Sequence, residues 1–202
     1  MRVRTLDVAD GKVVTEVLCE AFYDYPVMRW VLESAGADYD RQLERMVGFF
    51  VAARTLRGEP FVGIDHGGSL GAVAMLSDPN GPPSPAELGA EREAVWSDLG
   101  QEARSRYEAF GEACAPLLVT QPHLHLNMIG TLRAARGRGY GKILLEYVHS
   151  MSERDPDSRG VSLTTEDPAN VPLYESFGYE ITGHARVSPA VETWAFYRPN
   201  RQ

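Results

Sequence analysis

The sequence has little of what secreted, disulfide-rich or membrane proteins need. Its two cysteines, Cys19 and Cys114, lie far apart in helix-like segments and lack the spacing of a metal site, so we expect reduced, partly buried thiols and no metal. Residues 1–7 lack the apolar core of a signal peptide. No apolar run approaches the ~20 residues of a membrane helix. We therefore expect a soluble cytoplasmic protein without a membrane partner.

Positive charge is also scarce. The chain has 20 lysines and arginines against 28 aspartates and glutamates, a formal net charge of −8. Binding of a nucleic-acid backbone needs a basic face, so this balance argues against nucleic acid as the main partner. An acidic surface concentrates cationic ligands, which is a weak indication of an amine substrate.

The remaining composition, 202 residues of which 44% are hydrophobic, fits one globular domain with a buried core. Apolar spacing and turn signals predict helices at about 10–25, 27–32, 38–56, 85–115 (one helix or two), 142–151 and 171–177. They predict strands at 2–6, 124–131, 161–165, 179–187 and 192–197, a hairpin at 61–76 and a loop at 78–85. This mixture indicates an α/β (α+β) fold around a mostly antiparallel sheet.

A glycine-rich turn follows the strand at 124–131 and leads into a helix. The turn reads Arg-Gly-Arg-Gly-Tyr-Gly over residues 136–141. Backbone N–H groups at a helix start lack intrahelical partners, and the helix dipole adds positive charge there, so such a turn binds phosphate. The glycines leave room for the phosphate, and Arg136, Arg138 and Lys142 add cationic charge.

The spacing of this turn excludes two common nucleotide motifs. A P-loop needs a serine or threonine after its lysine, whereas Lys142 is followed by Ile143. A dinucleotide fold needs Gly-x-Gly-x-x-Gly, whereas residues 137–141 are spaced Gly-x-Gly-x-Gly.

The turn fits instead the pattern Gln/Arg-x-x-Gly-x-Gly/Ala through Arg136, Gly139 and Gly141. It resembles the coenzyme A-binding motif of the GNAT acetyltransferase superfamily. The resemblance implies a GNAT-like mixed sheet of about six to seven strands flanked by helices, acetyl-CoA as co-substrate, and a turn that holds its pyrophosphate. The implied coenzyme-binding residues are Ile129, Gly130 and Thr131, whose backbone runs beside pantetheine, and Arg136, Gly137, Arg138, Gly139, Tyr140, Gly141 and Lys142 in the turn.

A second segment, residues 170–180, looks like the family's Asn-x-x-x-Tyr-x-x-x-Gly-Phe motif. Asn170 can cap a short helix, and Tyr174 lies about one turn further on the same face. The resemblance places both beside the coenzyme. When an amine attacks a thioester, a thiolate leaves; a phenol of pKa ~10 can give it a proton, since a thiol has a pKa of ~8.5. Tyr174 is therefore the predicted general acid.

The match narrows to one branch of the superfamily. Residues 123–131, 136–141, 170–179 and 194–198 are similar to the puromycin N-acetyltransferase-like branch. The resemblance is good over about 120–200 and loose over 1–115. It implies a single domain over 1–202, with acceptor-side helices at about 7–57 and 85–115 and an acetyl-CoA-binding half at about 120–200.

Two positions depart from that branch. Residues 131–133 read Thr-Leu-Arg instead of Val-x-Pro, which is tolerable because the binding part there is backbone. Residues 163–166 read Leu-Thr-Thr-Glu where relatives often carry Leu-Glu-Thr, so the carboxylate is displaced by two positions. In the relatives that glutamate is a candidate base or amine-binding carboxylate. Strand alternation puts Thr164 and Glu166 on one face, so the resemblance implies that Glu166 can take its place as a candidate catalytic base. The alternative is that Glu166 lies in a loop and points to water.

A base is needed because a free alkylamine is mostly protonated at neutral pH and only its neutral form attacks. His125 is a second candidate, since histidine titrates near neutrality and can pass a proton through water. The alternative is a hydrogen-bonded histidine lining the sheet. Asp24 and Tyr25 follow the first helix, where relatives build the acceptor pocket, so the resemblance implies substrate binding there; the alternative is an ordinary helix end.

The sequence therefore predicts an N-acetyltransferase that moves the acetyl group of acetyl-CoA to a small-molecule amine by direct attack, with Tyr174 as general acid. One alternative is a protein or peptide N-acetyltransferase. Another is a non-catalytic acyl-CoA-binding sensor or partner module, which the missing Leu-Glu-Thr carboxylate keeps open. Edge strands in such folds often pair, so a homodimer also stays open.

Overall fold

The computed structural model describes residues 2–79, 81 and 83–201. Seven strands form one sheet in the order β1-β2-β3-β4-β5-β7-β6, and β4 and β5 are its one parallel pair within the described residues. The strands are β1 (Val3–Leu6), β2 (Phe61–His66), β3 (Ser69–Ser77), β4 (Leu124–Thr131), β5 (Gly160–Thr165), β6 (Glu180–Ser188) and β7 (Val191–Pro199). The predicted mixed, mostly antiparallel sheet is confirmed, with seven strands.

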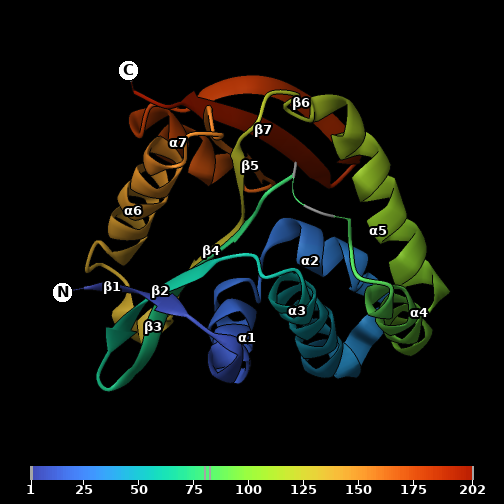
Figure 1. Ribbon diagram of the computed structural model, residues 1–202. Coiled ribbons are helices and arrows are strands. Elements are labelled where there is room, and N and C mark those ends of the chain that lie inside the picture. Colours follow the sequence, from blue (N-terminus) through green and yellow to red (C-terminus); the bar gives the residue numbers. More distant parts are fainter. Residues whose placement is uncertain (1, 80, 82, 202) are drawn as a thin grey trace.

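Helices cover both faces of this sheet. In the part of the chain that the structure describes, five α-helices lie on one face: α1 (Gly11–Ala21), α2 (Pro26–Val31), α3 (Tyr39–Leu56), α4 (Glu87–Leu99) and α5 (Gln101–Cys114). Two lie on the other: α6 (Tyr140–Arg154) and α7 (Val171–Ser176), as Figure 1 shows. Side chains alternate between the faces along each strand, so Val73 and Met75 of β3 pack under the first group and Ala72 and Ala74 under the second.

The first helix is shorter than the sequence pattern predicts. It ends at Ala21, and Pro26 begins α2 at its first turn instead of closing α1. Proline suits that position because its missing N–H has no intrahelical partner and its φ is already helical. Tyr25 is extended at the junction (φ −72°, ψ 134°), and its side chain lies between the helices and the end of β5.

The predicted segment 85–115 forms two helices. Gly100 separates α4 from α5 with φ of 88°, a left-handed conformation that favours glycine. Trp96 and Leu99 are buried as predicted, whereas Tyr107 and Phe110 are half-buried because they line a cavity. In the preceding loop at 78–85, residues 80 and 82 lie outside the described residues.

The sheet opens between β4 and β5. The two strands pair at Leu124–Val161, His125–Ser162 and Leu126–Leu163. On the other side of β4, the register with β3 shifts after Met75, so that Asn127 is the extra residue of a bulge. From Asn127 onward the edge of β4 that faces β5 has no strand partner among the described residues.

Candidate active site

A cavity of about 380 Å³ lies where β4 and β5 diverge. Its volume suits a small-molecule ligand. Helices α1, α2, α3 and α5 form one wall, and β4, β5 and the start of α7 form the other. The predicted site residues that line it come from distant parts of the chain: Tyr25, His125, Ile129, Glu166, Asn170 and Tyr174.

Tyr174 presents a hydroxyl group without an internal partner. Its ring is buried against Tyr179 and Phe196, with ring centroids 5.8 and 5.6 Å away. Within the part of the chain that the structure describes, no residue hydrogen-bonds to the hydroxyl, although the side chain lines the cavity. Burial raises the pKa of Tyr174 to about 12, so the phenol keeps its proton at neutral pH. It is therefore available as a proton donor to a ligand.

Glu166 directly follows β5 and faces the cavity. It is only 6% exposed, and Thr193 Oγ1 donates a hydrogen bond to its Oε1 at 2.7 Å. Thr164 also lines the cavity, as strand alternation predicts. Burial raises the pKa of Glu166 above its usual range, which makes its carboxylate a stronger base than an exposed one. A loop carboxylate that points to water does not fit this placement.

The side chains of Tyr25 and Asn170 hold the end of β5 in place. The Tyr25 hydroxyl accepts a hydrogen bond from the Glu166 N–H at 2.9 Å and lies 3.0 Å from Thr165 Oγ1. Asn170 Nδ2 donates to the same Thr165 oxygen at 3.2 Å. Asn170 is the N-cap residue of α7, but its side chain makes no capping hydrogen bond, so the predicted side-chain cap is wrong. Tyr25 lines the cavity with its ring, while its hydroxyl positions Glu166.

His125 does not have the properties expected of a base that titrates near neutrality. Its Nδ1 lies 2.7 Å from Ser162 Oγ on the paired strand. Burial lowers the pKa of His125 to about 4, and the charges of His123 and Arg54 act in the same direction. The imidazole is therefore neutral at physiological pH and accepts a proton poorly, which favours the alternative of a hydrogen-bonded histidine that lines the sheet.

Asp24 lies outside the cavity. Its carboxylate is exposed, pairs with Arg29 at 2.7 Å and lies 3.7 Å from the Arg133 guanidinium. Cations on the protein itself thus occupy this carboxylate, and the placement does not fit the predicted role in substrate binding.

The glycine-rich turn has the geometry of an anion site. Gly139, with φ of 76°, is the N-cap of α6, and the first helical hydrogen bond runs from the Ile143 N–H to its carbonyl at 3.1 Å. The N–H groups of Tyr140, Gly141 and Lys142 therefore have no intrahelical partner. Arg136, Arg138 and Lys142 are exposed around them. A Cβ built at Gly137, Gly139 or Gly141 would meet no described atom within 4 Å, so the turn is open to a ligand.

Tyr140 contributes backbone and not its side chain to that turn. Its ring is buried, and its hydroxyl lies 3.1 Å from Nδ1 of His66 at the end of β2. This contact fixes the start of α6 against the β2–β3 hairpin.

The open edge of β4 presents backbone groups toward the cavity side. The Leu132 N–H donates to the Gly71 carbonyl at 2.9 Å, toward β3. Successive N–H groups of a strand point to opposite edges, so Gly130 also faces β3, whereas Ile129 and Thr131 face the open edge. Gly130 serves packing as well, because a Cβ there would lie 2.7 Å from Ala21 Cβ on α1. Strand edge and turn together fit an extended chain that ends in phosphates.

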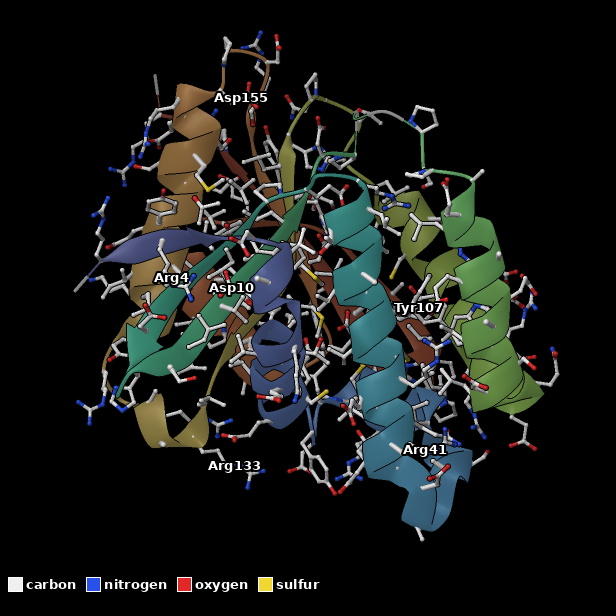
Figure 2. All side chains as sticks on the ribbon, turned by 60° about the horizontal axis from the view of Figure 1, so that its bottom comes forward. Arg4, Asp10, Arg41, Tyr107, Arg133 and Asp155 are labelled. Carbon is white, nitrogen blue, oxygen red and sulfur yellow. The ribbon has the colours of Figure 1, made fainter. Side chains whose placement is uncertain are left out.

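Sequence reasoning missed several polar residues of the cavity, among them Arg54 and Tyr107. Arg54 continues a stripe of α3 that includes Met46 and Phe50, at intervals of four residues. Tyr107 stacks on Phe50 and packs against Trp96, between α3 and the α4–α5 pair in Figure 2. The four-residue interval could have indicated that Arg54 shares the cavity-facing side of α3. An arginine in the last turn of a helix is also explained by its interaction with the helix dipole, so the interval alone did not single it out.

Comparison with known proteins agrees with this architecture. The family model described as "Acetyltransferase (GNAT) domain" matches residues 94–181, which include β4, the turn and Tyr174. A structure titled histone acetyltransferase HPA2 and related acetyltransferase from Corynebacterium glutamicum has a TM-score of 0.72 at 20% identity, covering 99% of this chain and 96% of that chain.

Two insect enzymes align over almost their whole length. Arylalkylamine N-acetyltransferase 2 from Aedes aegypti has a TM-score of 0.65 at 14% identity, covering 99% of each chain. Polyamine N-acetyltransferase from Drosophila melanogaster has a TM-score of 0.57 at 20% identity, covering 98% of this chain and 99% of that chain. These solved structures show that the fold is the GNAT fold, and the family model adds a sequence match over residues 94–181.

Proposed function

We propose that the protein is an N-acetyltransferase that moves the acetyl group of acetyl-CoA to the amine of a small molecule. The observation that carries the proposal is the junction of three features at one opening: the unpaired edge of β4, the anion-binding turn at the start of α6, and a cavity that contains Tyr174 and Glu166. The first two suit a phosphate-bearing chain, and the third suits an acceptor and its proton transfers.

In the proposed reaction, Glu166 takes a proton from the acceptor's ammonium group, directly or through water. The neutral nitrogen attacks the thioester carbon, and the C–N bond forms as the C–S bond breaks. A backbone N–H at the open edge, from Ile129 or Thr131, polarises the thioester oxygen. Tyr174 protonates the leaving sulfur, the attacking nitrogen gives up its remaining extra proton through water to the Tyr174 phenolate, and Glu166 releases its proton to solvent. The cavity that raises the pKa of Tyr174 also disfavours a bare thiolate, which helps this transfer.

The size of the cavity favours a small acceptor over a protein chain. A volume of about 380 Å³ is at the small end of ligand pockets. Two structural neighbours bear titles that name small amines, arylalkylamine and polyamine N-acetyltransferases, and this supports the same class here. Closer kinship with the puromycin N-acetyltransferase-like branch, a cytoplasmic location and homodimerisation stay predictions of the sequence. No helix of the described residues is both long and apolar enough to span a membrane.

The test is release of free thiol from acetyl-CoA by the purified protein with a panel of primary amines and N-terminal peptides. We expect release that depends on a small amine and that loss of Tyr174 reduces. Thiol release with peptides but with no small amine would show that the acceptor is a protein or peptide. Tight acetyl-CoA binding without release for any acceptor would contradict transfer and favour a non-catalytic acyl-CoA-binding module.

A further inference from the structure

The acceptor cavity contains a positively charged side chain that the transfer reaction does not require. Arg54 lies two residues before the end of α3 and lines the cavity together with Met46 and Phe50 of the same helix face. Its side chain is only 18% exposed. A buried guanidinium is costly unless an anion and hydrogen-bond acceptors surround it.

The protein supplies Arg54 with few partners. Its Nε donates to Asn127 Oδ1 at 3.3 Å and lies 3.2 Å from Glu59 Oε2. Glu59 is shared, since Arg57 Nη1 lies 3.9 Å from the same oxygen. Neither terminal nitrogen of Arg54 donates a hydrogen bond to any described residue. These are the atoms that bind a carboxylate in a two-pronged geometry.

The electrostatics agree with an incompletely compensated cation. Burial lowers the pKa of Arg54 below its usual value, Glu59 opposes this shift, and Arg57 adds to it. Of the two carboxylates that line the cavity, Glu166 accepts a hydrogen bond from Thr193 and Asp167 accepts one from the Ala169 N–H, and neither pairs with Arg54. The arginine therefore retains attraction for an anion that enters the cavity.

The walls around Arg54 and Glu166 are mostly apolar. They include Phe22, Met28, Val31 and Phe110, with Tyr107 stacked on Phe50 beside them. Arg54 reaches Asn127 on β4, whereas Glu166 is fixed to Thr193 on β7. The cavity thus holds a cationic group, Arg54, on one wall and two carboxylates, Glu166 and Asp167, on the other, with apolar surface around them. This arrangement suits a ligand bearing both charges.

We propose that the acceptor is an amine that also bears a carboxylate, which the Arg54 guanidinium binds while the amino group lies at Glu166 and Tyr174. This rests on the proposed function, because it specifies the acceptor of the same transfer. The unused pair of donors on Arg54 selects a planar anion, and the apolar walls select a hydrocarbon body between or beside the two charged groups.

The test compares acceptors that differ only in charge: phenylalanine with phenylalaninamide, 4-aminobutanoate with 4-aminobutanamide, and 6-aminohexanoate with its amide. We expect kcat/KM to favour the acid in at least one pair by about tenfold or more, a typical effect of a charge pair shielded from water. Arg54→Met keeps the aliphatic stem and should abolish this preference, because it lowers the rate with the acid more than the rate with the amide. Arg54→Lys should keep part of it.

Arg57→Met is the matched control, because Arg57 also pairs with Glu59 but does not line the cavity. Equal rates for acid and amide in every pair of the wild type would overturn the carboxylate site. An equal loss for both members in Arg54→Met would also overturn it, since that is the signature of a structural arginine.

Calorimetry with 3-phenylpropanoate, which has no amine, separates this site from the transfer reaction. We expect binding that Arg54→Met abolishes and Arg57→Met retains. If no amine in the panel releases thiol, the proposed transfer fails; Arg54-dependent binding of 3-phenylpropanoate would then still support the anion site. Absence of that binding would overturn it.

Discussion

The two sides of the candidate site differ in whether backbone or side-chain atoms form them. The coenzyme side consists of backbone: the open edge of β4 and the N–H groups at the start of α6, with exposed arginines around them. The acceptor side consists of side chains from α1, α2, α3 and α5, most of them apolar, with buried charged groups at Arg54 and Glu166. A backbone site tolerates exchange of its side chains, whereas a side-chain cavity changes its ligand with each substitution. In the proposed transfer, the first side fixes the donor and the second selects the acceptor.

The largest expected effect is at Tyr174, where the two sides meet. Tyr174→Phe should lower turnover on the order of 10²–10⁴-fold, because it removes one proton donor from the transition state. Affinity for acetyl-CoA, measured by calorimetry, should stay nearly unchanged. Tyr197→Phe is a matched control, since that hydroxyl is buried, has no hydrogen-bond partner among the described residues and lies outside the cavity. Normal turnover in Tyr174→Phe would assign Tyr174 a packing role.

Glu166→Gln should lower turnover by about 10²-fold at neutral pH, because the amide cannot accept the ammonium proton. In the wild type the rate should rise with pH as Glu166 ionises. Since burial raises the pKa of Glu166, that rise should lie above the ordinary carboxylate value of ~4.3. The pH–rate profile with saturating acceptor measures this, and persistence of the same rise in Glu166→Gln would assign it to another group.

The same variant makes a stability prediction. The raised pKa of Glu166 means that the folded protein holds this proton more tightly than the unfolded chain. That contribution to stability is complete below the unfolded pKa and is lost as pH rises through the folded pKa. Glu166→Gln should therefore melt at a higher temperature than the wild type at pH 7, and the difference should shrink in acid. A lower Tm at pH 7 would contradict the cost assigned to the buried carboxylate.

Phosphate binding by the glycine-rich turn can be tested with one substitution that should leave the fold intact. Gly141→Asp adds a side chain where a Cβ meets no described atom and where the backbone is helical, so the fold should be retained. The new carboxylate repels a bound pyrophosphate and should weaken acetyl-CoA binding by about 10–100-fold. Gly89→Asp, in the first turn of α4, is the same change away from the site. If acetyl-CoA bound to both variants with equal affinity, the hypothesis that this turn binds the pyrophosphate would be contradicted.

The coenzyme side of the site could be predicted from the sequence, whereas most of the acceptor side could not. The strand 124–131 and the glycine turn were predictable, because period-two alternation and glycine spacing act over a few residues. The acceptor cavity was not: Arg54 meets Asn127 across 73 positions, and Tyr25 holds Glu166 across 141. Glu166 was predictable as a candidate by its strand face, but the effect of burial on its pKa depends on packing. The low pKa of His125 has the same origin.

The smallest expected effect is at His125. Because burial lowers the pKa of His125 to about 4, its protonation cannot shape the rate between pH 6 and 8. His125→Gln, which keeps a hydrogen-bonding group near Ser162, should change turnover by less than about tenfold. A pH–rate step near ~6.5 that disappears in this variant would return the proton-transfer role to His125.

Amide hydrogen exchange with and without acetyl-CoA tests the central claim most directly, because the claim is that backbone at the β4–β5 opening binds the coenzyme. We predict slower exchange on adding acetyl-CoA in two segments, residues 127–133 and 137–143, with no change in α3 or α4. Loss of both effects in Gly141→Asp would tie them to the bound coenzyme. Slower exchange confined to other segments, or none at saturating acetyl-CoA, would contradict the account.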